Sequence, residues 1–444
     1  SDTDVYVGYK IIKPSGKEII VDLSRAVKME RKGTYSKTAY NKIAIPGLEP
    51  GDILDYYECE ETSEAIYSYL HFYDPIIHSL PSEYPIQYYK VQFRADRKCY
   101  INLKSVNGAP EFKLITDEKN DEQYYTIEGT ELESASAQRW LFEYRDLPTI
   151  KFRAAYAVKE SIITYTDVLL GEKKVAKTKI TVKELEDLTS NFLKTYYVEY
   201  GPLRLYARKN LAKITDPFEL STRAYYYLRN SMVVKEAEQY AWQGSTPNAS
   251  ALYFYKAMHG FLKEKKIPHD LIIACNRNIS DIDDVIMENE LEWLIRVKKG
   301  DAYLYLSPYN VHTVPGSFDV LLEGTEAYAM DGLKAPKWSA KKFTMPTQRR
   351  SEHQSQTTQK ISLSADMATA TVQVNKVLTG KNKLYEQYHL VDYYDYKAEE
   401  ISMFKKEEKP LKKDKQALKN TFMNKRMPAK NEWLKEFIEQ TYQV

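Results

Sequence analysis

The residues of this chain best suited to nucleophilic chemistry are three cysteines, and seven histidines offer acid–base groups. A cysteine attacks as its thiolate, which requires a nearby base or a helix N-terminus. Cys59, Cys99 and Cys275 lie far apart and form no C-x-x-C pair, which argues against a zinc site or a disulfide framework. Cys275 lies inside the apolar run LIIACN, so we expect a buried structural thiol there.

Motifs for metals and cofactors are weak. The chain has no glycine-rich phosphate loop, dinucleotide fingerprint or nucleophile elbow. Asp281, Asp283 and Asp284 lack the glycine and terminal glutamate of a calcium loop, so an acidic helix start is the better interpretation. The histidine spacing fits no standard metal motif. We therefore expect neither a bound metal nor a cofactor.

The elements that would position a site are two helices followed by strands, between Asp216 and Asp331. Asp216, Pro217 and Glu219 supply a cap, a first-turn proline and a capping-box acid. Asn248 is a candidate cap for the second helix. The run LIIACN suits a strand that is covered on both faces. The successive segments read PFELSTRAYYYLRNSM, GSTPNASALYFYKAMHGFL, DLIIACN, LEWLIRVKKGDAYLYLSP and PGSFDVLLEGTEAY.

This order of segments resembles the core of papain-type transglutaminases. In that family a cysteine opens the second helix, a histidine begins the next strand, and an aspartate closes the strand after it. Alignment on the second helix puts Pro247, Glu292 and Ser307 at these three places. Proline has no nucleophilic group. The resemblance therefore implies a degenerate core, a pseudoenzyme that keeps the fold without the reaction.

Other nucleophiles keep an enzymatic alternative open. Ser245, Thr246 or Ser250 would serve as a hydroxyl nucleophile if a base were adjacent, and Cys275 would be a displaced thiol. By resemblance, such an enzyme would be a cysteine- or serine-dependent amide-bond hydrolase or transferase acting on peptides or peptidoglycan stems. His312, in the loop after Ser307, is a candidate to enter the cleft, although a polar loop histidine is the commoner case.

Residues 1–195 show repeated short strands separated by turn signals, which is typical of a β-sandwich. Two phrases, IAIPGLEPGDILDYYECEE and HFYDPIIHSLPSEYPIQYYKVQF, resemble an N-terminal β domain of unknown function. That domain precedes transglutaminase-like cores in exported bacterial proteins. The resemblance implies a periplasmic or cell-surface location, and no signal peptide is present in this chain.

The C-terminal third changes pattern twice. After a polar connection, ISLSADMATATVQVNKVLTG alternates as a hairpin, and we expect the strands to continue through LYEQYHLVDYY. From residue 401 the chain is helical and lysine-rich, and it leads toward a missing region. Interleaved acids favour a solvated helix over a patch for nucleic acid or membrane.

Composition narrows the class of partner. The net charge of +2 gives no drive toward nucleic acid, and no apolar run approaches the ~20 residues of a transmembrane span. Tyrosine, with 38 residues against 14 phenylalanines, predicts wide exposed sheets. Tyrosine also suits glycan contacts, so a carbohydrate-binding outer-membrane accessory protein is a further alternative.

The sequence thus predicts an α+β multidomain protein. Its parts are an N-terminal antiparallel β-sandwich over 1–195, a transglutaminase-like α/β core over 200–335, a second small β domain over 336–400 and a helical segment over 401–444. We expect a non-catalytic binding or scaffolding module that meets a protein or glycan partner of the cell envelope.

Overall fold

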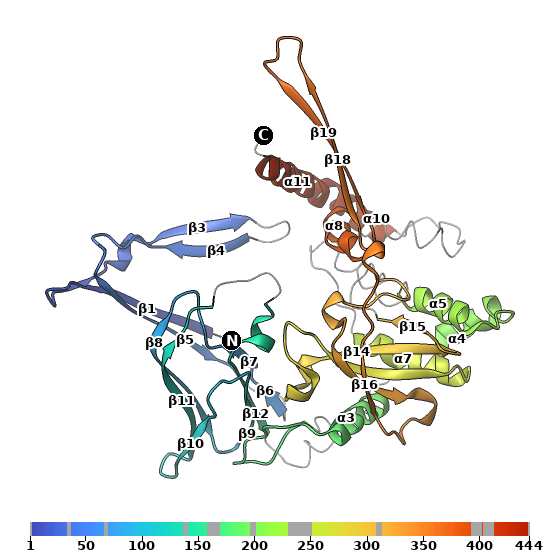
Figure 1. The fold of residues 1–444 in the computed structure, drawn as a ribbon, viewed down its shortest axis with the longest axis horizontal. Helices are drawn as coiled ribbons and strands as arrows, with labels where there is room; N and C mark the ends of the chain where they lie inside the picture. Colours follow the sequence, from blue (N-terminus) through green and yellow to red (C-terminus); the bar gives the residue numbers. More distant parts are fainter. Residues whose placement is uncertain are drawn as a thin grey trace. The chain divides into compact units, whose positions relative to one another are not determined.

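The computed structural model describes residues 2–32, 37–65, 70–135, 141–157, 169–195, 201–229, 251–307, 313–391, 402 and 413–442. They form several antiparallel sheets with helices between them and a helix at the C-terminal end (Figure 1). The predicted mixture of α and β structure is confirmed. Contacts divide the chain into one unit of Ser1–Ser68, Ala237–Pro247 and Glu407–Val444, and a second of Tyr69–Glu236 and Asn248–Lys406.

The first unit carries two antiparallel sheets. β1 (Asp2–Ile12) pairs along its length with β5 (Ile53–Ser63) and at one end with β2 (Glu18–Ile20), while β3 (Val27–Lys32) pairs with β4 (Lys37–Lys42). Nearly every side chain of β5 is exposed, including Tyr56 and Tyr57. The predicted exposed tyrosine-rich sheet is confirmed here. Among its described residues, the α-helices of this unit are α10 (Lys413–Thr421) and α11 (Met427–Tyr442).

The phrase IPGLEPGD forms a turn that one carboxylate holds together. Asp52 accepts a hydrogen bond from the backbone N–H of Glu49 at 2.8 Å and from Lys13 Nζ at 2.8 Å. Lys13 also donates to the Gly47 carbonyl at 2.8 Å. The Lys13 ammonium therefore fixes this turn against the end of β1, and its hydrogen bond lowers the pKa of Asp52.

The second unit begins with two sheets that share apolar cores. β12 (Thr149–Ala157) pairs with β6 (Leu70–Phe72), β7 (Ile76–Ser79) and β9 (Cys99–Val106). β11 (Glu122–Leu132) lies between β8 (Ile86–Asp96) and β10 (Lys113–Asp117). Phe93 of β8 stacks on Phe152 of β12 with ring centroids 4.0 Å apart, so side chains of both sheets meet in one core.

Helices and a five-stranded antiparallel sheet form the next part of this unit. The strand order is β15-β14-β13-β16-β17. The strands are β13 (His269–Cys275), β14 (Leu291–Lys299), β15 (Ala302–Leu306), β16 (Glu326–Asp331) and β17 (Lys341–Thr344). The helices are α3 (Val182–Thr195), α4 (Gly201–Asn210), α5 (Pro217–Leu228) and α7 (Ala251–Glu264), preceded by the short α1 (Glu143–Asp146).

Strand β13 is buried along its whole length, as predicted. Its odd-numbered residues Leu271 and Ile273 pack in the cluster that contains the helices, and its even-numbered Ile272 and Ala274 pack in a second cluster with Phe318. Because successive side chains of a strand point to opposite faces, an unbroken apolar run is what two covered faces require. The cap at Asp216 is also confirmed, since its side chain accepts from the N–H groups of Phe218 and Glu219.

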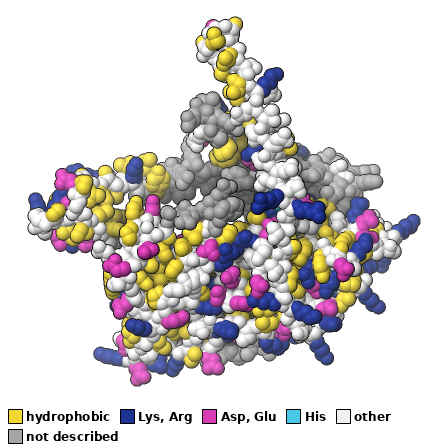
Figure 2. Space-filling model, viewed as in Figure 1, with side chains coloured by type: hydrophobic (Ala, Val, Ile, Leu, Met, Phe, Trp, Pro, Cys, Tyr) yellow, Lys and Arg dark blue, Asp and Glu magenta, His cyan; other side chains and the backbone are white. Residues whose placement is uncertain are grey.

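The C-terminal part of this unit differs from the predicted strands. β18 (Ser355–Leu363) and β19 (Ala370–Leu378) form a two-stranded sheet, and Figure 2 shows hydrophobic side chains along it and at its tip. Ile361 of β18 and Met367 of the connecting turn are among the exposed hydrophobic residues. The next segment is helix α8 (Leu384–Leu390), so the strand predicted through LYEQYHL is wrong. Glu386 in its first turn pairs with Lys376 of β19 at 2.6 Å.

Strand β17 lies beyond residue 335, where the predicted core ends, yet it pairs with β16. The four-part division of the chain stays a prediction. None of the helices in the described part of the chain has the length and apolar character that crossing a membrane requires.

Candidate functional site

The three places that correspond to the transglutaminase triad do not form a site among the described residues. Pro247 lies outside them, as do Ser245, Thr246, Asn248, Ser250 and His312. Glu292 pairs with Ala274, so it lies on the sheet face turned away from α5 and α7. Ser307 follows β15 and is buried, and its carbonyl accepts a hydrogen bond from the Tyr225 hydroxyl at 3.1 Å.

Glu292 lies in an apolar setting. Burial, with the negative charge of Asp319 nearby, raises its pKa to about 6. A carboxyl group with this pKa is partly protonated just below neutral pH. Its cross-strand neighbour on β13 is Ala274, which has no nucleophilic group.

Cys275 ends β13 and is 1% exposed. Its Sγ lies 3.7 Å from the carbonyl oxygen of Asn276. Burial, helped by the charge of Glu290, raises the pKa of the thiol far above its ordinary value. The thiolate is therefore scarce at neutral pH, and the prediction of a buried structural cysteine is confirmed. Cys99 is buried and Cys59 exposed, and all three thiols are free.

Two buried histidines form a pair that the sequence analysis did not anticipate. His259 of α7 and His269 of β13 approach each other with Nδ1 of the first 2.9 Å from Nε2 of the second. Nδ1 of His269 lies 2.8 Å from the carbonyl oxygen of Ile267. Burial lowers the pKa of both rings, to about 3 for His259. Both imidazoles are therefore neutral at physiological pH.

A pocket of about 300 Å³ lies beside this pair, between α3, α7 and the segment 335–338. This volume matches the lower end of small-molecule sites. Along α7 it is lined by Lys256, His259, Gly260 and Lys263, which recur at the spacing of one helix face. Its remaining wall is mostly apolar and is made by Ser190, Leu193, Lys194, Ala335, Pro336 and Trp338.

The pocket carries positive charge. Lys256 is half-buried, and its Nζ donates to the Phe192 carbonyl at 3.4 Å, while Lys263 Nζ donates to the Ala335 carbonyl at 3.1 Å. Burial lowers the pKa of Lys256. Within the described residues, no carboxylate lies in ion-pair distance of Lys194, Lys256 or Lys263. In the sequence, the only trace of this pocket wall is the spacing of Lys256, His259, Gly260 and Lys263 along the second predicted helix.

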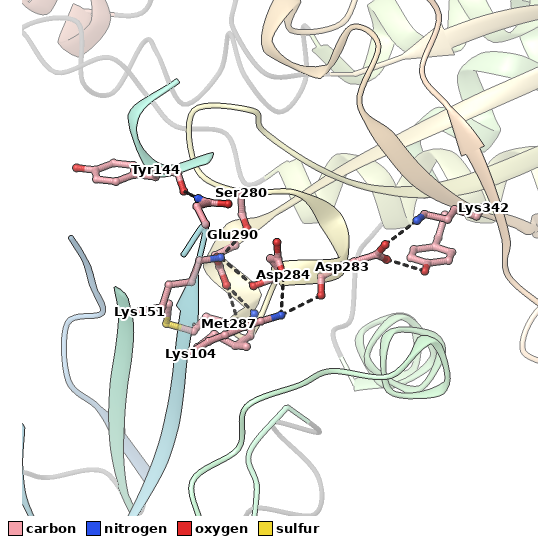
Figure 3. A network of polar contacts seen from close by, with 12 residues as sticks. Lys104, Tyr144, Lys151, Ser280, Asp283, Asp284, Met287, Glu290 and Lys342 are labelled. Carbon is pink, nitrogen blue, oxygen red and sulfur yellow. Dashed lines mark hydrogen bonds and ion pairs between the residues drawn. The ribbon is translucent and has the colours of Figure 1, made fainter. Parts of the chain in front are cut away.

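A second polar network is structural. Lys151 of β12 is fully buried and forms an ion pair with the fully buried Glu290, and it donates to Ser280 Oγ at 2.6 Å and to the Asp284 carbonyl at 2.9 Å (Figure 3). Glu290 accepts from the N–H groups of Ile286 at 2.8 Å and Met287 at 2.9 Å. The polar atoms of Lys151 and Glu290 bind other groups of the network. The network therefore holds β12 against the segment between β13 and β14. Asp281, Asp283 and Asp284 belong to this segment.

Groups of three or more metal-ligating side chains in metal-binding geometry do not occur among the residues that the structure describes. Two of the three aspartates in the segment 281–284 pair with lysines: Asp283 with Lys342 at 2.6 Å and Asp284 with Lys104 at 2.7 Å (Figure 3). These carboxylates therefore act in ion pairs within the fold.

Comparison with known proteins gives one distant structural neighbour. No family model matches the sequence, and no curated protein matches it. A crystal structure of a "putative protease" from Parabacteroides distasonis is similar over 78% of this chain and 62% of that chain, with 11% identity and a TM-score of 0.43. This chain thus spans less than two thirds of that protein's length. A likeness this low carries no inference about activity.

Proposed function

We propose that this chain is a non-catalytic protein with a transglutaminase-like core that acts as a binding or scaffolding module at the bacterial cell envelope. The transglutaminase-like part of this proposal is supported by the packing of α5 and α7 on one face of the antiparallel sheet β15-β14-β13-β16-β17. The envelope location rests on the resemblance of the N-terminal phrases, one of which forms the turn around Asp52.

The observation that carries the proposal is the state of Cys275. Buried at the end of β13, it is held as a thiol, and it lies on a strand instead of opening a helix. A nucleophilic cysteine needs access and a lowered pKa, and Cys275 has neither. Glu292 supports the same interpretation, because its carboxyl lies on the sheet face opposite to α7.

Activity-based labelling of the intact chain tests the absence of catalysis. A fluorophosphonate probe near neutral pH is expected to leave the protein unlabelled, because an unassisted hydroxyl is barely ionised. An iodoacetamide probe is expected to label exposed Cys59 and to leave Cys275 unmodified until the protein is unfolded.

A Cys59→Ser variant is the matched control for the thiol probe, and its native form is expected to take up no label. Fluorophosphonate labelling at Ser245, Thr246 or Ser250 that disappears on unfolding would overturn the proposal. So would rapid alkylation of Cys275 in the native protein. Either result would favour the amide-bond hydrolase or transferase.

A further inference from the structure

The histidine pair fixes which nitrogen His259 offers to the pocket. A carbonyl oxygen only accepts, so His269 Nδ1 carries the hydrogen that it donates to Ile267. Neutral His269 then has a lone pair on Nε2, which accepts from Nδ1 of His259. Neutral His259 is left with an unprotonated Nε2. Within the described part of the chain, this nitrogen has no hydrogen-bond partner.

This acceptor lies in a buried and shaped setting. His259 is only 6% exposed, yet it lines the pocket. With Nδ1 turned to His269, Nε2 is the ring nitrogen available to a molecule in the pocket. A free acceptor that faces the pocket is available to any ligand that donates a hydrogen bond there.

Gly260 follows His259 on α7 and also lines the pocket. It lies within α7, where glycine is less favourable than alanine by about 1 kcal/mol. Its neighbours on the lining face of the helix are Lys256 and Lys263. Because Gly260 has no side chain, the helix backbone itself forms part of the pocket wall.

We propose that this pocket binds a small organic carboxylate with an apolar side chain and an adjacent N–H group, the chemistry of an N-acyl amino acid. Lys256 and Lys263 would hold the carboxylate, His259 Nε2 would accept from the N–H, and Leu193, Pro336 and Trp338 would contact the apolar group. This inference deepens the proposed binding role and rests on it, since it names the site and the class of ligand.

Both sources of such a group share this chemistry. A free N-acyl amino acid and the C-terminal residue of a peptide each present a carboxylate next to an amide N–H. The neutral state of His259 selects for a donor on the ligand, because a second acceptor would face the lone pair of Nε2. The lysines select for negative charge.

Titration calorimetry on the full chain tests the assignment with N-acetyl-leucine as the probe. N-acetyl-leucinamide lacks the charge, and N-acetyl-N-methyl-leucine lacks the N–H. Each analogue is expected to bind at least about tenfold more weakly, which corresponds to about 1.4 kcal/mol. Equal binding of all three compounds, or of inorganic phosphate and N-acetyl-leucine, would overturn the proposed ligand class.

Variants locate the binding in the pocket. Lys256→Met and Gly260→Leu are each expected to weaken N-acetyl-leucine binding at least about tenfold, by removing charge and by filling space. Lys265→Met is the matched control, because this exposed lysine on the same helix end does not line the pocket. Unchanged binding in both pocket variants, or no binding to the unmodified chain at millimolar concentration, would rule the site out.

A peptide arm separates the two sources. If acetyl-Ala-Ala-Leu binds more tightly than N-acetyl-leucine, the ligand is a peptide C-terminus, and otherwise it is the free acyl amino acid. Both results support the shared chemistry. If N-acetyl-leucine does not bind, the proposal of a non-catalytic core is unaffected, because the labelling experiment tests that proposal separately. Labelling of a nucleophile would contradict the non-catalytic proposal, but it would not contradict ligand binding in the pocket.

Discussion

Glu292 is a residue whose ionised carboxyl group destabilises the folded protein. It lies among the apolar side chains of one sheet face, near the like charge of Asp319. Its pKa rises from 4.5 to about 6, so the folded protein binds a proton here more tightly than the unfolded chain does. The charged form therefore lowers stability, and this loss develops as pH rises from about 4.5 through 6.

Replacing this carboxyl by an amide should remove that loss. We expect Glu292→Gln to be more stable than the parent near pH 7, by up to about 2 kcal/mol, with the difference vanishing below about pH 4.5. Urea unfolding at a series of pH values measures it. Glu288→Gln serves as a control for a nearby carboxyl, and a Glu292→Gln gain that is equal at all pH values would contradict the electrostatic cause.

At the scale of elements, the start of α5 depends on a single cap. Asp216 accepts from the N–H of Phe218 at 3.0 Å and of Glu219 at 2.9 Å, and its other oxygen pairs with Lys299 of β14. The same carboxylate therefore accepts hydrogen bonds from N–H groups of the first turn of α5 and, through Lys299, links the helix to the sheet. Helix α5 supplies Tyr225, whose ring contacts Phe254 of α7.

Loss of the cap should be measurable. Asp216→Ala is expected to cost about 1–2 kcal/mol of unfolding free energy, while Asp216→Ser should retain most of the cap. Asp301→Ala, at an exposed turn, is the control and should change stability by less than about 0.5 kcal/mol. Chemical denaturation compares all three. An equal loss in the alanine and serine variants would assign the effect to the ion pair with Lys299.

Sequence reasoning succeeded where the signal is local. Asp216 before Pro217 predicted the start of a helix, and LIIACN predicted a strand buried on both faces, because each pattern is complete within a few residues. It failed at Leu384–Leu390, where the alternating pattern of the preceding hairpin was extended into a further strand. That segment is a helix that pairs with β19 through Glu386.

The pocket could not be predicted for a different reason. His259 and His269 are ten residues apart and meet only because β13 returns alongside α7. The lining segment 335–338 is still more distant in sequence. Such contacts belong to tertiary structure, and neither periodicity nor motif spacing reports them. The place of Glu292 on the far sheet face likewise depends on strand register, which a one-residue slip reverses.

At the scale of the whole molecule, one buried ion pair joins two folded parts of the second unit. Lys151 on β12 and Glu290 before β14 are 139 residues apart in sequence, and neither side chain is exposed. Removing one partner of such a pair leaves an uncompensated buried charge. The network also includes Asn102, which donates to the Ile286 carbonyl at 2.6 Å.

We expect Lys151→Met to lower the unfolding free energy by about 3–5 kcal/mol and to make the two parts unfold at different denaturant concentrations. The transition followed by tryptophan fluorescence, to which Trp293 and Trp338 contribute, would then separate from the transition followed by far-ultraviolet circular dichroism. Lys104→Met, which breaks the more exposed pair with Asp284, should cost less than about 1 kcal/mol. Partial recovery in the Lys151→Met, Glu290→Gln double variant is expected, and its absence would argue for a packing effect.

Cys59 on β5 is the exposed one of the three sulfhydryls. A thiol-specific reagent that modifies the native protein will therefore report on a strand of the first unit, far along the chain from β13. If ligand or partner binding is lost after such treatment, the loss would indicate that the exposed face of β5 takes part in that binding. The same residue offers a ready attachment point for a fluorophore or a spin label, with no engineered substitution.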